Sequence, residues 1–160
     1  MKKVLKIFIF ISMFAVLLGC GKKEIVKKEK DYTMGDLTFK IPSSFKEESN
    51  NSSMLAFSYS DKEMKNGCYL TVMSNDYYKQ DLEEEVKGNI YSDGEPTIDT
   101  VSIGNKEWKL AKLTVSEKAT YYSYAAVQNN KLYTMTYDDV GTGDYCNTAY
   151  NIIINSLKFK

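Results

Sequence analysis

Three cysteines, Cys20, Cys68 and Cys146, are the most reactive side chains in this sequence of 160 residues. A thiol becomes a nucleophile when a neighbouring base removes its proton, and His is the usual base. The chain contains no His, so we expect no catalytic thiol. Cys68 and Cys146 either pair in a disulfide that closes a loop of about 80 residues, or lie apart as small apolar side chains.

A second group of reactive side chains is acidic: Asp138, Asp139 and Asp144 share one short segment with Gly141 and Gly143. Flexible, oxygen-rich loops bind hard cations such as calcium, so this segment is a candidate cation loop, although its spacing matches no EF-hand. In the alternative, structural interpretation, the glycines allow a turn and Asp144 caps the helix that follows. The sequence leaves both interpretations open.

A third acidic group, Glu83, Glu84 and Glu85, would serve a hydrolase only if two carboxylates faced each other across a cleft. The same run is typical of the solvated face of a helix. The chain has no Arg, which removes the bidentate partner of carboxylates and phosphates. It also shows no nucleotide-binding loop, metal-ligand set or nucleophile triad. We therefore predict a protein that is not an enzyme and uses no metal or cofactor.

The fourth candidate is aromatic, since the chain contains 13 Tyr and one Trp. Tyr122 and Tyr124 alternate along one expected strand, and Tyr133 and Tyr137 alternate along the next. Alternating residues of a strand share one face of a sheet. The four rings either pack across the strands inside the protein, or form an exposed aromatic face for a glycan or protein partner.

Near the N-terminus, lysines precede an apolar run of 12 residues, Ile7 to Leu18, which is shorter than the roughly 20 residues of a membrane span. The run ends in Leu17-Leu18-Gly19-Cys20. This segment, residues 1–19 with Cys20, resembles the signal peptide and lipobox of bacterial lipoproteins. The resemblance implies cleavage before Cys20 and attachment of lipid to its thiol. The protein would then be held at the outer face of the cytoplasmic membrane.

Composition divides the rest of the chain into a tether, residues 20–31, and one domain, residues 32–160. The tether is rich in Lys and Glu, so it cannot bury an apolar face and is expected to be flexible. The domain carries 13 Lys against 18 acids. It therefore has no positive excess with which to follow a phosphate backbone, and nucleic acid is not an expected partner.

The elements that would position these residues follow from hydrophobic alternation and turn signals. Helices are expected at residues 80–91 and 144–156, where apolar residues recur at helical spacing. Gly104-Asn105 and Asn129-Asn130 suit two-residue turns between strands. Strands are expected at residues 37–41, 54–60, 68–73, 101–103, 108–115, 121–128, 132–137 and 157–160. This order predicts an α+β fold, an antiparallel β-sheet with helices packed against it.

Several segments carry a resemblance to the PsbP-like α/β/α sandwich: Leu37 to Pro42 with Phe45 after it, the turn at Gly104, the tyrosine-rich hairpin 121–137, and Ile152 to Phe159. This resemblance implies a non-enzymatic accessory or binding domain. We therefore expect a membrane-anchored extracytoplasmic lipoprotein. Its expected partners are membrane lipid, through Cys20, and an envelope protein or another extracytoplasmic ligand. The alternatives are a sensor of a small ligand or cation, and a cell-envelope hydrolase.

Overall fold

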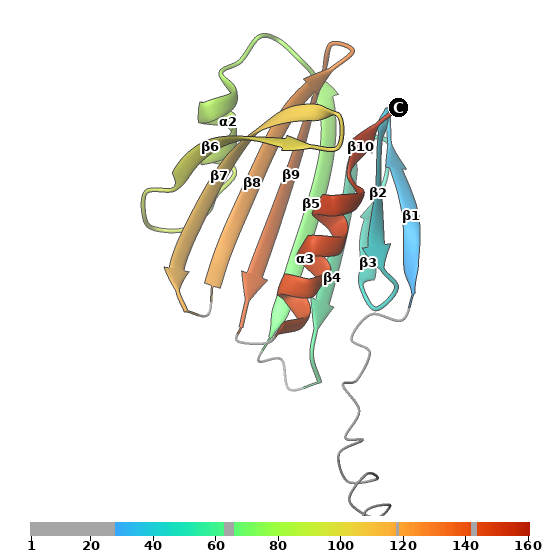
Figure 1. The fold of residues 1–160 in the computed structure, drawn as a ribbon, viewed down its shortest axis with the longest axis vertical. Helices are drawn as coiled ribbons and strands as arrows, with labels where there is room; N and C mark the ends of the chain where they lie inside the picture. The colour runs from blue at the N-terminus through green and yellow to red at the C-terminus, as the bar shows by residue number, and fades with distance from the viewer. Residues whose placement is uncertain (1–27, 63–65, 118, 142–143) are drawn as a thin grey trace, which may run out of the picture.

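The structure is a computed structural model that describes residues 28–62, 66–117, 119–141 and 144–160. The described part is mostly antiparallel sheet, with two helices (Figure 1). The helices are α2 (Leu82–Gly88) and α3 (Asp144–Ser156). The strands are β1 (Glu29–Met34), β2 (Leu37–Pro42), β3 (Lys46–Asn50), β4 (Met54–Ser60), β5 (Gly67–Asp76), β6 (Thr97–Ile103), β7 (Lys106–Ser116), β8 (Ala119–Gln128), β9 (Lys131–Val140) and β10 (Lys158–Phe159). Neither of the described helices is long and apolar enough to cross a membrane.

The larger sheet has seven strands in the order β3-β4-β5-β9-β8-β7-β6, and each neighbouring pair is antiparallel. Asn129 and Asn130 both have positive φ and form the two-residue turn between β8 and β9. Gly104, with φ of 61°, forms part of the turn between β6 and β7. Both turns are those expected from the sequence. The pairing of β9 with β5 joins the two halves of the chain into one sheet.

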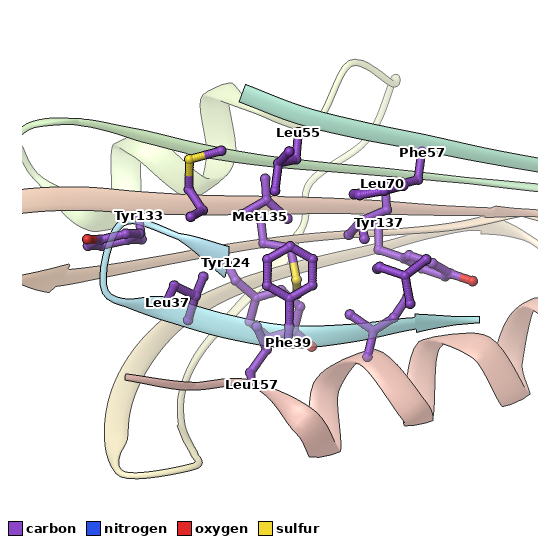
Figure 2. Close-up of a cluster of buried hydrophobic side chains, with 14 of the residues drawn as sticks. Leu37, Phe39, Leu55, Phe57, Leu70, Tyr124, Tyr133, Met135, Tyr137 and Leu157 are labelled. Atoms are coloured by element: carbon purple, nitrogen blue, oxygen red, sulfur yellow. The ribbon is translucent and has the colours of Figure 1, made fainter. Parts of the chain in front are cut away.

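One face of this sheet is covered by a layer built from the two ends of the domain. In that layer β2 pairs with β1 on one side and with β10 on the other, and α3 packs beside β2 (Figure 1). Leu37 and Phe39 of β2 and Leu157 after α3 point toward side chains of β4, β5, β8 and β9 (Figure 2). The main apolar core therefore lies between the two layers, and its burial is the chief favourable term in folding.

The opposite face of the large sheet is partly covered by α2, which packs on β7 and β8. The carboxylate of Asp81 accepts a hydrogen bond of 2.8 Å from the backbone N–H of Glu83, so Asp81 is the N-cap of this helix. A second, smaller apolar cluster lies beneath α2 and is formed by Val86, Ala111, Ala125 and Leu132. Helices thus pack against an antiparallel sheet, which confirms the predicted α+β fold class.

Two strands, β1 and β3, are not predicted by the sequence, because both are polar and lack an alternating apolar run. β1 is held by backbone pairing with β2 and by an ion pair in which Lys40 Nζ lies 3.1 Å from Glu29. Residues 29–31 therefore belong to the folded domain, and the predicted tether of residues 20–31 is too long by these three. The helix α2 ends at Gly88, earlier than the predicted residue 91.

Candidate functional site

Cys68 of β5 and Cys146 in the first turn of α3 are joined by a disulfide, with their Cα atoms 5.7 Å apart. Both residues are almost fully buried in the main core. Of the two alternatives that the sequence leaves open, the structure therefore contains the bonded pair. Neither sulfur is a free thiol. Cys20, the predicted lipid attachment site, lies outside the described residues.

The aromatic face expected from the sequence is buried. Tyr122 of β8 does pair with Tyr137 of β9, so the four rings share one face as predicted. However, three of them are at most 2% exposed, namely Tyr124, Tyr133 and Tyr137. Tyr122 stacks on Tyr150 of α3, with ring centroids 4.4 Å apart. The interpretation of these rings as an exposed binding face is wrong, because the layer that contains α3 and β2 covers them.

The hydroxyl groups of these rings are bonded within the protein. Tyr137 donates a hydrogen bond of 2.7 Å to the backbone carbonyl of Cys146. The hydroxyls of Tyr124 and Tyr150 bond to each other. Burial raises the pKa of Tyr124 and of Tyr137 well above the ordinary value, since the phenolate would lose its hydration. Both side chains are therefore neutral core groups that fix the position of α3 on the sheet.

The predicted cation loop is also corrected. Asp138 and Asp139 belong to β9, which continues to Val140, so their side chains point to opposite faces of the sheet. Asp144 begins α3. β9 continues to Val140 because both of its neighbours pair with it up to that residue, β5 through Gly67 and β8 through Ala119. Within the part of the chain that the structure describes, no group of three or more His, Cys, Asp or Glu could hold a metal ion.

The glutamates at the start of α2 form surface ion pairs. Glu83 lies 2.8 Å from Lys109 Nζ of β7, and Glu84 lies 2.9 Å from Lys87 Nζ in the same helix. Exposed pairs of this kind contribute little to stability, because water and salt screen the two charges. Their position on the surface of α2 corresponds to a solvated helix face, which is one of the two interpretations of this glutamate run.

A groove of about 650 Å³ runs between α3 and the outward face of β1 and β2, and both apolar and polar side chains line it. The inward side chains of β2 enter the core, so the outward ones, such as Lys40, form the wall of the groove. The charged and amide residues that line the groove are Glu29, Asp31, Lys40, Asn151, Asn155 and Lys158. The ion pair with Glu29 raises the pKa of Lys40. The groove therefore presents charges of both signs and exposed amides.

A smaller pocket of about 270 Å³ lies on the opposite face of the large sheet, where the loop after α2 meets β5, β8 and β9. Its lining residues are Thr71, Asn89, Tyr91, Tyr121, Thr136 and Asp138. Burial raises the pKa of the Asp138 carboxyl. Among the described residues, none donates a hydrogen bond to this carboxylate or forms an ion pair with it. The pocket therefore contains a partly desolvated acid without a partner.

Scans against models of protein families and against curated proteins find no match. Solved structures do match. A crystal structure from Bacteroides thetaiotaomicron VPI-5482 is 15% identical over 83% of this chain, with a TM-score of 0.50, and this chain covers 48% of its length. The solution structure of cyanobacterial PsbP (CyanoP) from Synechocystis sp. PCC 6803 is 13% identical over 89% of this chain and 98% of its own, with a TM-score of 0.46. These are similarities of fold, and fold alone does not assign an activity.

Tyr91 and Tyr121 are pocket residues that are not among the sites predicted from the sequence. One signal was present, because Tyr121 precedes Tyr122 in a strand and so must face the other side of the sheet. No signal pointed to Tyr91, which lies in the loop after α2 and lines the pocket. The tyrosines that the sequence did single out lie on the buried face instead.

Replacing Asp138 by Asn is expected to raise the free energy of unfolding at neutral pH. The raised pKa of Asp138 means that the folded protein holds this proton more tightly than the unfolded chain does. Stability is therefore lost as the pH rises from the pKa of Asp138 in the unfolded chain through its higher pKa in the folded protein. The loss is complete at pH values above both. Asn has no charge to bury, so the gain in stability should be larger at pH 7 than near pH 3, where the carboxyl is protonated in both states.

Urea unfolding of both forms of the protein at pH 7 and near pH 3 measures this difference. The exposed Asp99→Asn variant controls for the loss of one negative charge from the protein surface. A gain in Asp138→Asn of the same size at both pH values would show that burial of the charge is not its cause.

Proposed function

We propose that the protein is a bacterial lipoprotein, anchored through lipid on Cys20 at the outer face of the cytoplasmic membrane, whose domain binds an envelope partner without chemical turnover. The apolar run followed by Leu17-Leu18-Gly19-Cys20 supports the anchor. The disulfide between Cys68 and Cys146 supports export, because disulfides persist in oxidising compartments and are rare in the cytosol.

The observation that carries the binding function is the groove between α3 and β1–β2. Glu29 lines this groove and follows Cys20 by only nine residues. A fully extended chain spans at most about 3.3–3.6 Å per residue, so the edge of the groove lies within about 30 Å of the lipid-bearing cysteine. A partner in the groove would therefore be bound close to the membrane surface.

The chemistry of the groove favours an extended polypeptide segment as its occupant. Asn151 and Asn155 lie one turn apart on α3 and are exposed. Each amide offers both donors and an acceptor, which is what an unpaired peptide backbone requires. The acids and lysines on the β1–β2 side add charges of both signs, which would favour a partner segment with the complementary arrangement. We infer that the partner is an envelope protein with such a segment near the membrane.

Photo-crosslinking on intact cells tests this proposal. A photoreactive amino acid replaces Asn151 in one variant and Tyr78 in a matched control, since Tyr78 is 81% exposed and does not line the groove. We expect position 151 to give one defined adduct with an envelope protein and position 78 to give none. Absence of an adduct at 151, or the same adduct from both positions, would contradict binding in the groove.

The anchor is tested separately with Cys20→Ala in the same crosslinking variant. We expect this protein to leave the membrane fraction and the adduct at position 151 to be lost, because the partner would no longer be held nearby. Retention of Cys20→Ala in the membrane fraction with unchanged gel mobility would contradict lipid attachment at Cys20. An unchanged adduct would show that binding does not depend on the anchor.

A further inference from the structure

The pocket around Asp138 is built from one cross-strand row on the face of the large sheet that carries α2. In the register of the sheet, Asp138 of β9 lies directly between Tyr69 of β5 and Tyr121 of β8. Directly paired residues point to the same side of a sheet. The carboxylate therefore has a tyrosine on each side, and the loop after α2 contributes a third ring, that of Tyr91.

Two of these rings have large exposed surfaces in this structure. Tyr69 is 53% exposed and Tyr91 is 91% exposed. Exposed large aromatic residues near a cavity provide the surface that a ligand would cover. Tyr121, by contrast, is partly buried and lines the pocket beside Asp138. The site thus combines one fixed ring with rings that a bound molecule would bury further.

The electrostatic character of the pocket selects a cation. Asp138 has no ion-pair or hydrogen-bond partner among the described residues, so its charge is uncompensated when ionised. The faces of tyrosine rings are electron-rich and attract cations placed over them. A carboxylate surrounded by such rings therefore stabilises positive charge by two mechanisms at once.

A metal ion is a poor match for this cation. Calcium takes six to eight oxygen ligands, whereas the pocket offers a single carboxylate with the neutral oxygens of Thr71, Thr136 and Asn89. Aromatic rings add nothing to the coordination of a hard cation. An organic ammonium ion, in contrast, buries its methyl or methylene groups against the rings and places its charge near the carboxylate.

We propose that the pocket formed by Asp138, Tyr91, Tyr121, Thr71, Thr136 and Asn89 binds a small organic ammonium ion. The ammonium group lies between the carboxylate and the tyrosine rings, and the threonine hydroxyls and the asparagine amide bond to a polar group elsewhere on the ligand. A volume of about 270 Å³ limits the ligand to a small molecule or to the end of a larger one. This site lies on the other face of the sheet from the groove, so it goes beyond the proposed function and does not require the anchor.

Titration calorimetry with choline as the probe tests the proposal on the purified full-length protein in a non-ionic detergent. Choline carries a trimethylammonium group and a hydroxyl, and 3,3-dimethyl-1-butanol is its uncharged analogue of the same shape. We expect choline to bind and the neutral analogue to bind at least tenfold more weakly, since it loses both the ion pair and the cation–π attraction. Equal binding of the two compounds, or no binding of choline, would overturn the proposal.

Three variants separate the contributions of the site. Asp138→Asn should weaken choline binding by about tenfold or more, because the negative charge that pairs with the quaternary ammonium group is replaced by a neutral amide. Tyr91→Ala should weaken binding severalfold, and it should fold normally because this ring is 91% exposed. Tyr78→Ala removes an exposed ring that does not line the pocket and should leave choline binding unchanged. If Asp138→Asn and Tyr91→Ala bind choline as well as the parent protein, the pocket is not the binding site.

Discussion

Replacing Cys68 and Cys146 together by Ala is expected to lower the free energy of unfolding by about 4.5 kcal/mol. The two cysteines are 78 residues apart in the chain. Closing a loop of that length restricts the unfolded chain, and the chain-entropy relation gives this magnitude at 25 °C. Because folded proteins of this size are stable by only about 5–15 kcal/mol, the loss would remove a large fraction of the total stability.

Urea unfolding of the full-length protein without reductant measures this effect. Dithiothreitol provides the matched control, since it should destabilise the parent protein by a similar amount and leave the Cys68→Ala, Cys146→Ala protein unchanged. A difference below about 1 kcal/mol between the two proteins would contradict the role assigned to the disulfide. Such a result would mean that core packing alone holds α3 against β5.

Replacing Gly104 by Ala is expected to cost about 3 kcal/mol or more. Gly104 has φ of 61°, a conformation that costs a residue with a Cβ about 1–2 kcal/mol. The added Cβ would also overlap the backbone carbonyl oxygen of Leu157, which cannot move aside as a flexible side chain can. The turn would have to shift away from the end of α3.

That shift would release the last strand as well. Asn105, next in the turn, makes two hydrogen bonds of 3.3 Å with the backbone of Phe159. Phe159 in turn stacks on Trp108, with ring centroids 5.5 Å apart. We therefore expect the Trp108 emission of Gly104→Ala to move to longer wavelength in the folded protein, as water reaches the indole ring.

Gly88→Ala is the matched control for this substitution. A Cβ at Gly88 would meet no atom within 4 Å. Ala is also the better helix former, so the control should be neutral or slightly stabilising. Urea unfolding of the two variants, followed by Trp108 fluorescence, compares them directly. If Gly104→Ala unfolds within about 0.5 kcal/mol of the parent protein, the turn does not hold β10 in the way described.

Most of the fold could be predicted from local patterns in the sequence. β4 has the predicted bounds, residues 54–60, because its apolar residues alternate and turn residues flank it. The strands β8 and β9 follow from the Asn129-Asn130 turn, which also sets their register. The helix α3 follows from the helical spacing of its apolar residues. In contrast, β1 and β3 are edge strands held by backbone pairing. Backbone pairing does not require apolar side chains, so the sequences of these two strands show no alternating apolar pattern.

The candidate sites were harder to predict, because they depend on which face of the sheet is covered. Alternation shows that Tyr122 and Tyr124 share a side, but it does not show that α3 and β2 will cover that side. The same alternation makes Asp138 and Asp139 point to opposite faces once they lie in a strand rather than a loop. The groove is less predictable still, since it brings residues of β1 and β2 beside residues of α3 about 120 positions later.

The central place of β2 between β1 and β10 constrains when this protein can fold. A chain that is synthesised or exported from its N-terminus presents Leu37 and Phe39 about 120 residues before Lys158 and Phe159 arrive to pair with the same strand. The covering layer cannot close until β10 has emerged. Pairings so distant in sequence form slowly, and apolar surface exposed in the meantime promotes aggregation. Removing β10 would therefore leave β2 unpaired along that edge, which makes the arrival of β10 a late requirement for productive folding.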